Sequence, residues 1–143
     1  MFYSESTIDV RYPDCDAMGI VHHAIYPYWY EIARMDFFAA CGYPYSYTHA
    51  YGVDPAMVSL ELKYKAPVRY PGSVTVRTTP TACAPKKLGL HYAVYFGENP
   101  DPVAEADSFH IWTGPDMKSY DLQQNLPEVY AAIHKAWETC QEA

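Results

Sequence analysis

Residues 12–26 decide the fold, and they read Tyr12-Pro13-Asp14-Cys15-Asp16-Ala17-Met18-Gly19-Ile20-Val21-His22-His23-Ala24-Ile25-Tyr26. The stretch joins two segments with different hydrophobic periodicities. In residues 7–12 apolar side chains alternate, with Ile8, Val10 and Tyr12 on one face, and this predicts a strand. Proline, aspartate and glycine follow in residues 13–19, so we expect a loop there.

The segment after this loop predicts a long helix over residues 27–41. Pro27 suits the first helical turn, and Gly42 followed by Pro44 gives a stop signal. Apolar residues occupy nearly every face of this helix, which is typical of a buried helix.

The rest of the chain alternates in period two and then returns to a helical pattern. We expect a loop or short helix over residues 43–52, strands over 57–64, 73–79, 88–96 and 103–113, and a closing helix with Asn125 as its N-cap. In the second strand Val58, Leu60, Leu62 and Tyr64 should point inward. The prediction is one α+β domain over residues 1–143, in which a five-stranded antiparallel sheet wraps a long buried helix and a C-terminal helix follows.

Composition excludes several classes of protein. The chain has 143 residues, of which 50% are hydrophobic and 19% charged, so it should fold into a globular core. A net charge of -7 argues against nucleic acid as a partner. The sequence has neither an apolar run long enough for membrane insertion nor a signal-like start, so we expect a cytoplasmic protein. Four cysteines and six histidines form no metal-binding spacing, and no metal is expected.

Positive charge is concentrated in one region. Residues 63–87 contain six basic and no acidic side chains: Lys63, Lys65, Arg69, Arg77, Lys86 and Lys87. These side chains either keep strand faces solvated or form an anion site for a small phosphorylated ligand. Both interpretations stay open on the sequence alone.

The candidate catalytic group is Asp16. It precedes a helix N-terminus, where backbone N–H groups are unpaired and a carboxylate is favoured. Gly19 permits a tight turn beside it. Taken alone, an Asp-x-x-Gly segment is also explained by turn and cap formation.

The stretch resembles the 4-hydroxybenzoyl-CoA thioesterase family, including its YbgC-type acyl-CoA thioesterases, which have the hotdog fold. The resemblance rests on Tyr12, Asp14-Cys15-Asp16, Gly19, Val21, His23 and Tyr26, and on Lys63-Tyr64-Lys65-Ala66-Pro67 in the second strand. It covers the order of elements over nearly the whole chain. The chain departs from the family at Gly72-Ser73, where Gly-Asp is frequent, and in residues 112–124.

The resemblance implies an enzyme that hydrolyses an acyl- or aryl-CoA to the free acid and CoA. It implies Asp16 as the catalytic carboxylate, His23 at the helix mouth, and Tyr12 beside Asp16. Substrate contacts are expected from Gly19, Val21 and Tyr26, and phosphate contacts from Arg69, Lys86 and Lys87. No separate cofactor is expected, because coenzyme A is part of the substrate.

Hydrolysis of a thioester is compatible with a site that has so few catalytic groups. A thiol ionises near pH 8.5, so the leaving group needs no strong acid. Helix N–H groups can stabilise the oxyanion, and Asp16 can act either as a base on water or as a nucleophile. Asp14 should be dispensable for this chemistry.

Two other functions use the same fold. One is an acyl-CoA or acyl-carrier binding module without turnover, for which a carboxylate beside the thioester would be a cost. The other is a hotdog dehydratase or hydratase, which ranks third because His23 and Asp16 precede the helix instead of lying on it. An open sheet edge also predicts self-association into a homodimer or homotetramer.

Overall fold

The computed structural model describes residues 1–141 and contains a sheet with the strand order β1-β3-β4-β5-β2, in which all neighbours are antiparallel. The strands are β1 (Ser4–Asp9), β2 (Asp54–Tyr64), β3 (Ser73–Ala84), β4 (Lys87–Phe96) and β5 (Ala104–Thr113). The helices are α1 (Tyr26–Ala40), α2 (Tyr45–His49), α3 (Leu122–Asn125) and α4 (Pro127–Gln141), with 3-10 turns at Tyr12–Asp14 and His23–Ile25. No helix within these residues is long and apolar enough to cross a bilayer.

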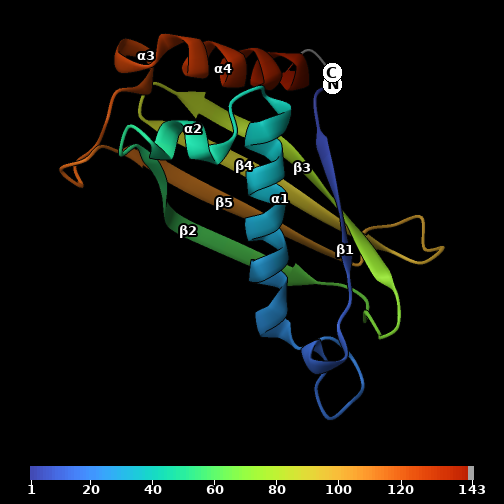
Figure 1. The fold of residues 1–143 in the computed structure, drawn as a ribbon. Helices are drawn as coiled ribbons and strands as arrows, with labels where there is room; N and C mark the ends of the chain where they lie inside the picture. The colour runs from blue at the N-terminus through green and yellow to red at the C-terminus, as the bar shows by residue number, and fades with distance from the viewer. Residues whose placement is uncertain (142–143) are drawn as a thin grey trace.

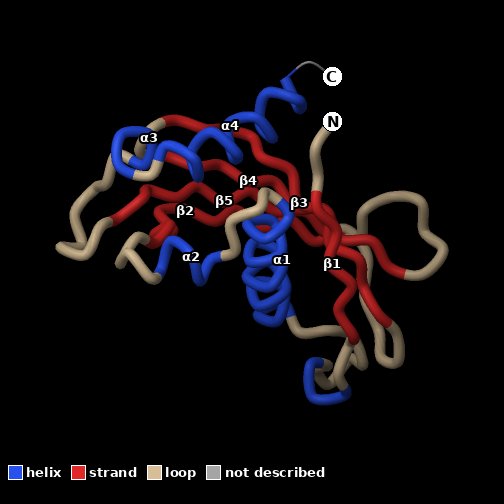
Figure 2. The backbone as a smooth tube through the Cα atoms, turned by 45° about the horizontal axis from the view of Figure 1, so that its top comes forward, coloured by secondary structure: helices blue, strands red, loops and turns tan. Residues whose placement is uncertain are grey.

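The helices lie on one side of the sheet. Figure 1 shows α1 running across the sheet, with α4 near the end of β3 and the start of β4. Figure 2 shows the sheet curving around α1, with β1 and β2 as its two edges. This is the predicted α+β hotdog arrangement.

One face of α1 supplies the centre of the core. Tyr26, Trp29, Tyr30 and Phe37 are all buried on this face, and each large side chain buried in this way contributes about 1.5–3 kcal/mol. The opposite face differs from the prediction of a helix buried all round, because Tyr28 and Ile32 are exposed in the single chain.

The first strand begins and ends earlier than predicted. Its inward residues Ser4 and Ser6 are polar, so hydrophobic alternation did not reveal them. Beyond its other end a 3-10 turn runs from Tyr12 to Asp14 with Pro13 inside it, and Arg11 and Asp14 form a reciprocal cap. Tyr12 therefore leaves the sheet and is 76% exposed.

Two further boundaries also differ from prediction. A register shift between Met57 and Ser59 leaves Val58 exposed instead of inward. The strand β3 continues past Pro80 to Ala84. Proline has no N–H to donate, but β1 pairs with β3 only as far as Thr78, so no hydrogen bond to β1 is lost at Pro80.

The closing helix begins at Pro127, and Asn125 is not its N-cap. Asn125 instead belongs to α3, where its side-chain amide donates to the carbonyl of Asp121. Asp121 caps α3 by accepting the N–H of Gln124. On α4 the side chains of Val129, Tyr130, Ile133 and Ala136 are buried.

A chain of hydrogen bonds crosses the core beneath α1. Arg34 contacts Tyr92 (3.1 Å), Tyr92 contacts Ser108 (2.8 Å), Ser108 contacts His110 (2.8 Å), and His110 contacts the Pro55 carbonyl (3.2 Å). Burial disfavours a charged imidazole and keeps His110 neutral at pH 7. The Pro55 carbonyl can only accept, so the single proton lies on Nδ1, and Nε2 then accepts from Ser108, whose hydroxyl accepts from Tyr92.

This neutral histidine makes stability depend on pH. Burial and then the nearby Arg34 charge lower the pKa of His110 to about 4. As the pH falls, the unfolded chain takes up the proton before the folded chain does. The stability that neutral His110 contributes is therefore complete above pH 6.5 and is lost as the pH falls toward 4. We expect the free energy of unfolding to drop by about 2 kcal/mol between pH 7.5 and pH 5.

Urea unfolding at the two pH values measures this drop. His110→Gln should remove most of the difference, whereas His134→Gln on α4 should leave it in place. An equal drop in the wild type and His110→Gln would assign the pH dependence to other groups.

Candidate active site

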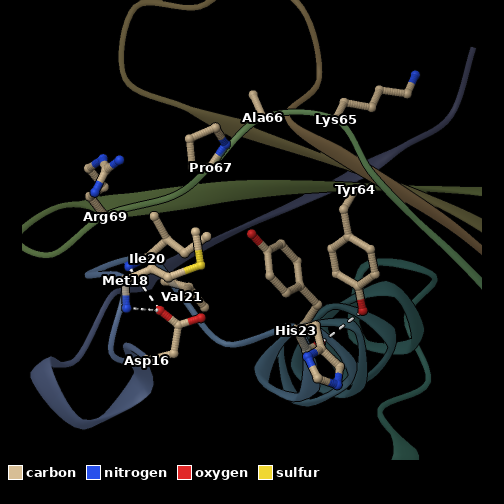
Figure 3. A pocket seen from close by; sticks show the side chains of 11 residues that line it. Asp16, Met18, Ile20, Val21, His23, Tyr64, Lys65, Ala66, Pro67 and Arg69 are labelled. Carbon is tan, nitrogen blue, oxygen red and sulfur yellow. Dashed lines mark hydrogen bonds between the residues drawn. The ribbon is translucent and has the colours of Figure 1, made fainter.

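A pocket of about 500 Å³ opens where the loop before α1 meets the segment after β2. Figure 3 shows that its walls come from these two parts of the chain, which are far apart in sequence. The lining residues are Asp16, Met18, Ile20, Val21, His23, Tyr26, Tyr64, Lys65, Ala66, Pro67 and Arg69. Five of the predicted site residues therefore line the pocket, and Gly19 lies in the loop beside it: the five are Asp16, Val21, His23, Tyr26 and Arg69.

Asp16 is held by its own loop. Its Oδ1 accepts the N–H groups of Met18 (2.8 Å) and Ile20 (3.4 Å). The backbone closes the same turn, since the Asp16 N–H donates to Ile20 and the Asp16 carbonyl accepts from Gly19. In Figure 3 the second carboxylate oxygen points toward the pocket. One oxygen is therefore used for positioning, and the other is available for chemistry.

Asp14 lies only two residues away but has a structural position. Its side chain is 2% exposed and pairs with Arg11 at 2.7 Å. Burial raises the pKa of Asp14, but hydrogen bonds from Arg11 and its charge outweigh this effect, and the pKa is lowered overall. Asp14 therefore holds the turn together, while Asp16 faces the pocket.

The 3-10 turn at residues 23–25 presents one free backbone donor. The Ala24 N–H donates to Nδ1 of His22 (3.0 Å), and the Ile25 N–H donates to the His22 carbonyl (3.0 Å). The N–H of His23 is the first of the turn and so has no acceptor within it. His23 lines the pocket, so this unpaired N–H belongs to a residue of the pocket wall.

Backbone contacts fix the loop against the segment after β2. The Val21 N–H donates to the Val68 carbonyl at 2.8 Å. Gly19 has a φ of 78°, a conformation that favours glycine, and its carbonyl accepts from Arg69 at 3.5 Å. The predicted tight turn at Gly19 is confirmed.

Aromatic rings form one wall of the pocket. Tyr26 is buried, and its ring meets Tyr64 edge-on with centroids 4.9 Å apart. Burial, followed by the neighbouring Tyr64, raises the pKa of Tyr26 to about 12, so its hydroxyl is protonated at neutral pH.

Positive charge lies at the pocket mouth. Arg69 is exposed in the pocket lining. Lys65 also lines the pocket, but its ammonium group is paired with Glu105. Lys65 and Tyr64 were not predicted as site residues, although the segment Lys63-Tyr64-Lys65-Ala66-Pro67 contributed to the family resemblance. The periodicity of a short segment cannot predict a contact between residues about 40 positions apart, such as the one between Tyr64 and His23.

Three predicted site residues lie elsewhere in the single chain. Tyr12 is exposed outside the pocket lining, where its ring contacts Tyr70. Lys86 and Lys87 lie at the turn between β3 and β4. The start of β3 is the end near the pocket, because the carbonyl of Gly72, just before β3, accepts from Val10 next to the loop. The turn lies at the other end of β3, so the length of the strand separates it from the pocket.

A metal centre is not formed by the described part of the chain, where no three His, Cys, Asp or Glu side chains are grouped for ligation. The pocket instead combines one carboxylate, one free backbone N–H and one cationic rim. That arrangement can activate a nucleophile and stabilise an oxyanion within one cavity.

Residues 10–128 match the family model of the thioesterase-like superfamily. The chain belongs to this superfamily. It is 31% identical over 141 residues to a Bacillus subtilis protein named "Putative acyl-CoA thioesterase YneP", covering 95% of this chain and 99% of the relative.

Solved structures agree with this membership in the thioesterase-like superfamily. A DHNA-CoA thioesterase from Staphylococcus aureus has a TM-score of 0.93 and 26% identity, covering 99% of this chain and 95% of that one. A hypothetical protein from Thermus thermophilus has a TM-score of 0.85 and 31% identity, covering 93% and 98%. The predicted family, the hotdog fold and a thioester hydrolase are confirmed.

Proposed function

We propose that this thioesterase-superfamily protein hydrolyses the thioester of an acyl- or aryl-CoA to the free acid and CoA. The observation that carries the proposal is one pocket lined both by Asp16, whose second carboxylate oxygen points into it, and by His23, whose N–H has no acceptor within its turn. The relatives named as acyl-CoA and DHNA-CoA thioesterases support CoA as the thiol. The reaction needs no cofactor, since CoA enters as part of the substrate.

In the proposed mechanism the thioester carbonyl points to the N-terminus of the helical segment. The His23 N–H donates to the oxygen as negative charge develops there, an interaction worth about 3–4 kcal/mol for a good donor. Asp16 either takes a proton from a water molecule that attacks the carbonyl, or attacks the carbonyl itself to form an anhydride that water then hydrolyses to the free acid and the restored carboxylate. The CoA thiolate leaves without a strong acid because thiols ionise near pH 8.5.

The remaining predicted residues have supporting roles in this proposal. The Tyr26 ring and Val21 shape the apolar part of the pocket, and Gly19 lets the loop close around Asp16. The His23 imidazole adds a polar contact at the mouth. Tyr12 could approach a substrate only from outside the pocket lining. A cytoplasmic location fits a substrate from acyl-CoA metabolism.

Asp16→Asn should lower kcat by on the order of 10²–10⁴, because it removes the base or nucleophile. Asparagine keeps the Oδ1 that accepts from Met18, so the loop should retain its turn. KM should stay the same or fall, because a negative charge beside the carbonyl is lost. Thiol release from aryl-, short-chain and long-chain acyl-CoAs measures these effects and identifies the substrate class.

Asp116→Asn is the matched control. Asp116 also accepts the N–H two residues on, from Lys118 at 3.0 Å, but lies in the loop after β5. Its replacement should leave kcat unchanged. Wild-type turnover by Asp16→Asn would contradict the catalytic role, and an absence of turnover in the wild type would favour the binding module.

We also propose that the protein is a homodimer or homotetramer that pairs its β2 edges. The β2 strand is an outer strand, and Met57 and Val58 are exposed along it. An unpaired edge of this length invites pairing with another strand. Sedimentation at micromolar concentration should give twice or four times the chain mass of 16.3 kDa, and a stable monomer would contradict the proposal.

Lys86 and Lys87 are proposed to hold CoA phosphates at the pocket of a second copy, together with Arg69 of the chain that forms the pocket. Lys86→Ala with Lys87→Ala should raise KM for acyl-CoA and leave kcat nearly unchanged, because remote phosphate contacts act equally in the ground and transition states. A substrate without the nucleotide is the control, since its KM should not change. An unchanged KM for acyl-CoA would show that the two lysines are only solvated.

A further inference from the structure

Three hydrogen bonds join residues 19–23 of the loop before α1 to the end of β2 and the segment after it. The first is the backbone bond from Val21 to Val68, and the second is the long contact from Arg69 to Gly19. The third is the Tyr64 hydroxyl, which donates to the carbonyl of His23 at 2.9 Å. Only the third of these bonds reaches His23, which lines the pocket (Figure 3).

The His23 carbonyl lies where a 3-10 turn passes into α1, and the 3-10 pattern offers it a single helical donor, the N–H of Tyr26 three residues later. In an α-helix it would accept from the N–H four residues later, and that residue is Pro27, which has none. The Tyr64 hydroxyl supplies a donor where proline cannot. The contact therefore compensates for the proline that begins the helix.

Tyr64 is well placed to act as an anchor. It is the last residue of β2 and is paired with Ala104 on β5. The next two residues, Lys65 and Ala66, both donate their N–H groups to the Val103 carbonyl. The Tyr64 ring is also fixed edge-on against Tyr26. Burial raises the pKa of Tyr64, so the hydroxyl stays protonated and can donate.

We propose that Tyr64 is a positioning residue for thioester hydrolysis. Its hydroxyl ties the first turn to the end of the sheet and so keeps the His23 N–H directed at the thioester carbonyl. The inference rests on the proposed function, because it concerns the same oxyanion contact. It adds a residue that need not touch the substrate to act.

Tyr64→Phe removes the hydroxyl and keeps the ring that packs on Tyr26. We expect kcat to fall roughly tenfold, the scale of one well-placed hydrogen bond, with KM within about twofold of wild type. Tyr47→Phe is the matched control, because the Tyr47 hydroxyl bonds Glu128 outside the pocket lining. It should change neither constant.

A rescue variant separates positioning from other roles. Pro27→Ala restores an N–H four residues after His23, so Tyr64→Phe with Pro27→Ala should recover most of the lost kcat. Thermal unfolding of each variant confirms that the folded protein is assayed.

Three results would overturn the proposal. The first is an unchanged kcat in Tyr64→Phe, and the second is a raised KM at constant kcat, which would indicate binding of the substrate ground state. The third is a loss of kcat that Pro27→Ala does not recover, which would assign the hydroxyl to direct contact with the substrate. A wild type without thiol release would instead refute the proposed function itself.

Discussion

Burial of one aromatic face of α1 against the sheet is the constraint on which the rest of the structure depends. Trp29, Tyr30 and Phe37 fit the curved inner face in one orientation, which fixes where the helix starts. That start lies beside the end of β2, so a short loop is enough to bring Asp16 and the His23 N–H into one pocket. The chemistry is therefore placed by the packing of apolar side chains that take no part in it.

The sequence predicts the architecture because the two periodicities are clear in most elements. The prediction fails where the residue type at a position does not follow the hydrophobic pattern of its element. The inward residues Ser4 and Ser6 are polar, so the start of β1 was not recognised. Val58 lies at a register shift, and alternation cannot reveal an extra residue in a strand. Asn125 has the chemistry of an N-cap, but Asp121 caps one turn earlier.

The candidate site was predictable to the extent that it is local. Asp16, Gly19 and His23 lie in one short stretch, so turn chemistry and family resemblance found them together. Tyr64 was predicted as an inward strand residue and as part of the family resemblance, but it is exposed at the pocket. Its contact with His23 was not predicted, because the hydrogen bond spans 41 positions in sequence. Lys86 and Lys87 were grouped with Arg69 by charge along the chain, whereas β3 separates them in space.

The two aspartates of the loop illustrate how strictly its length is set. Asp14 is buried against Arg11, and Asp16 faces the pocket with one oxygen free. Inserting or deleting one residue between the 3-10 turn and Gly19 would leave the Arg11–Asp14 pair in place, but it would move Asp16 out of the pocket or away from the N–H groups of Met18 and Ile20 that hold it. The loop should therefore accept substitutions at its exposed residues far more readily than any change in length.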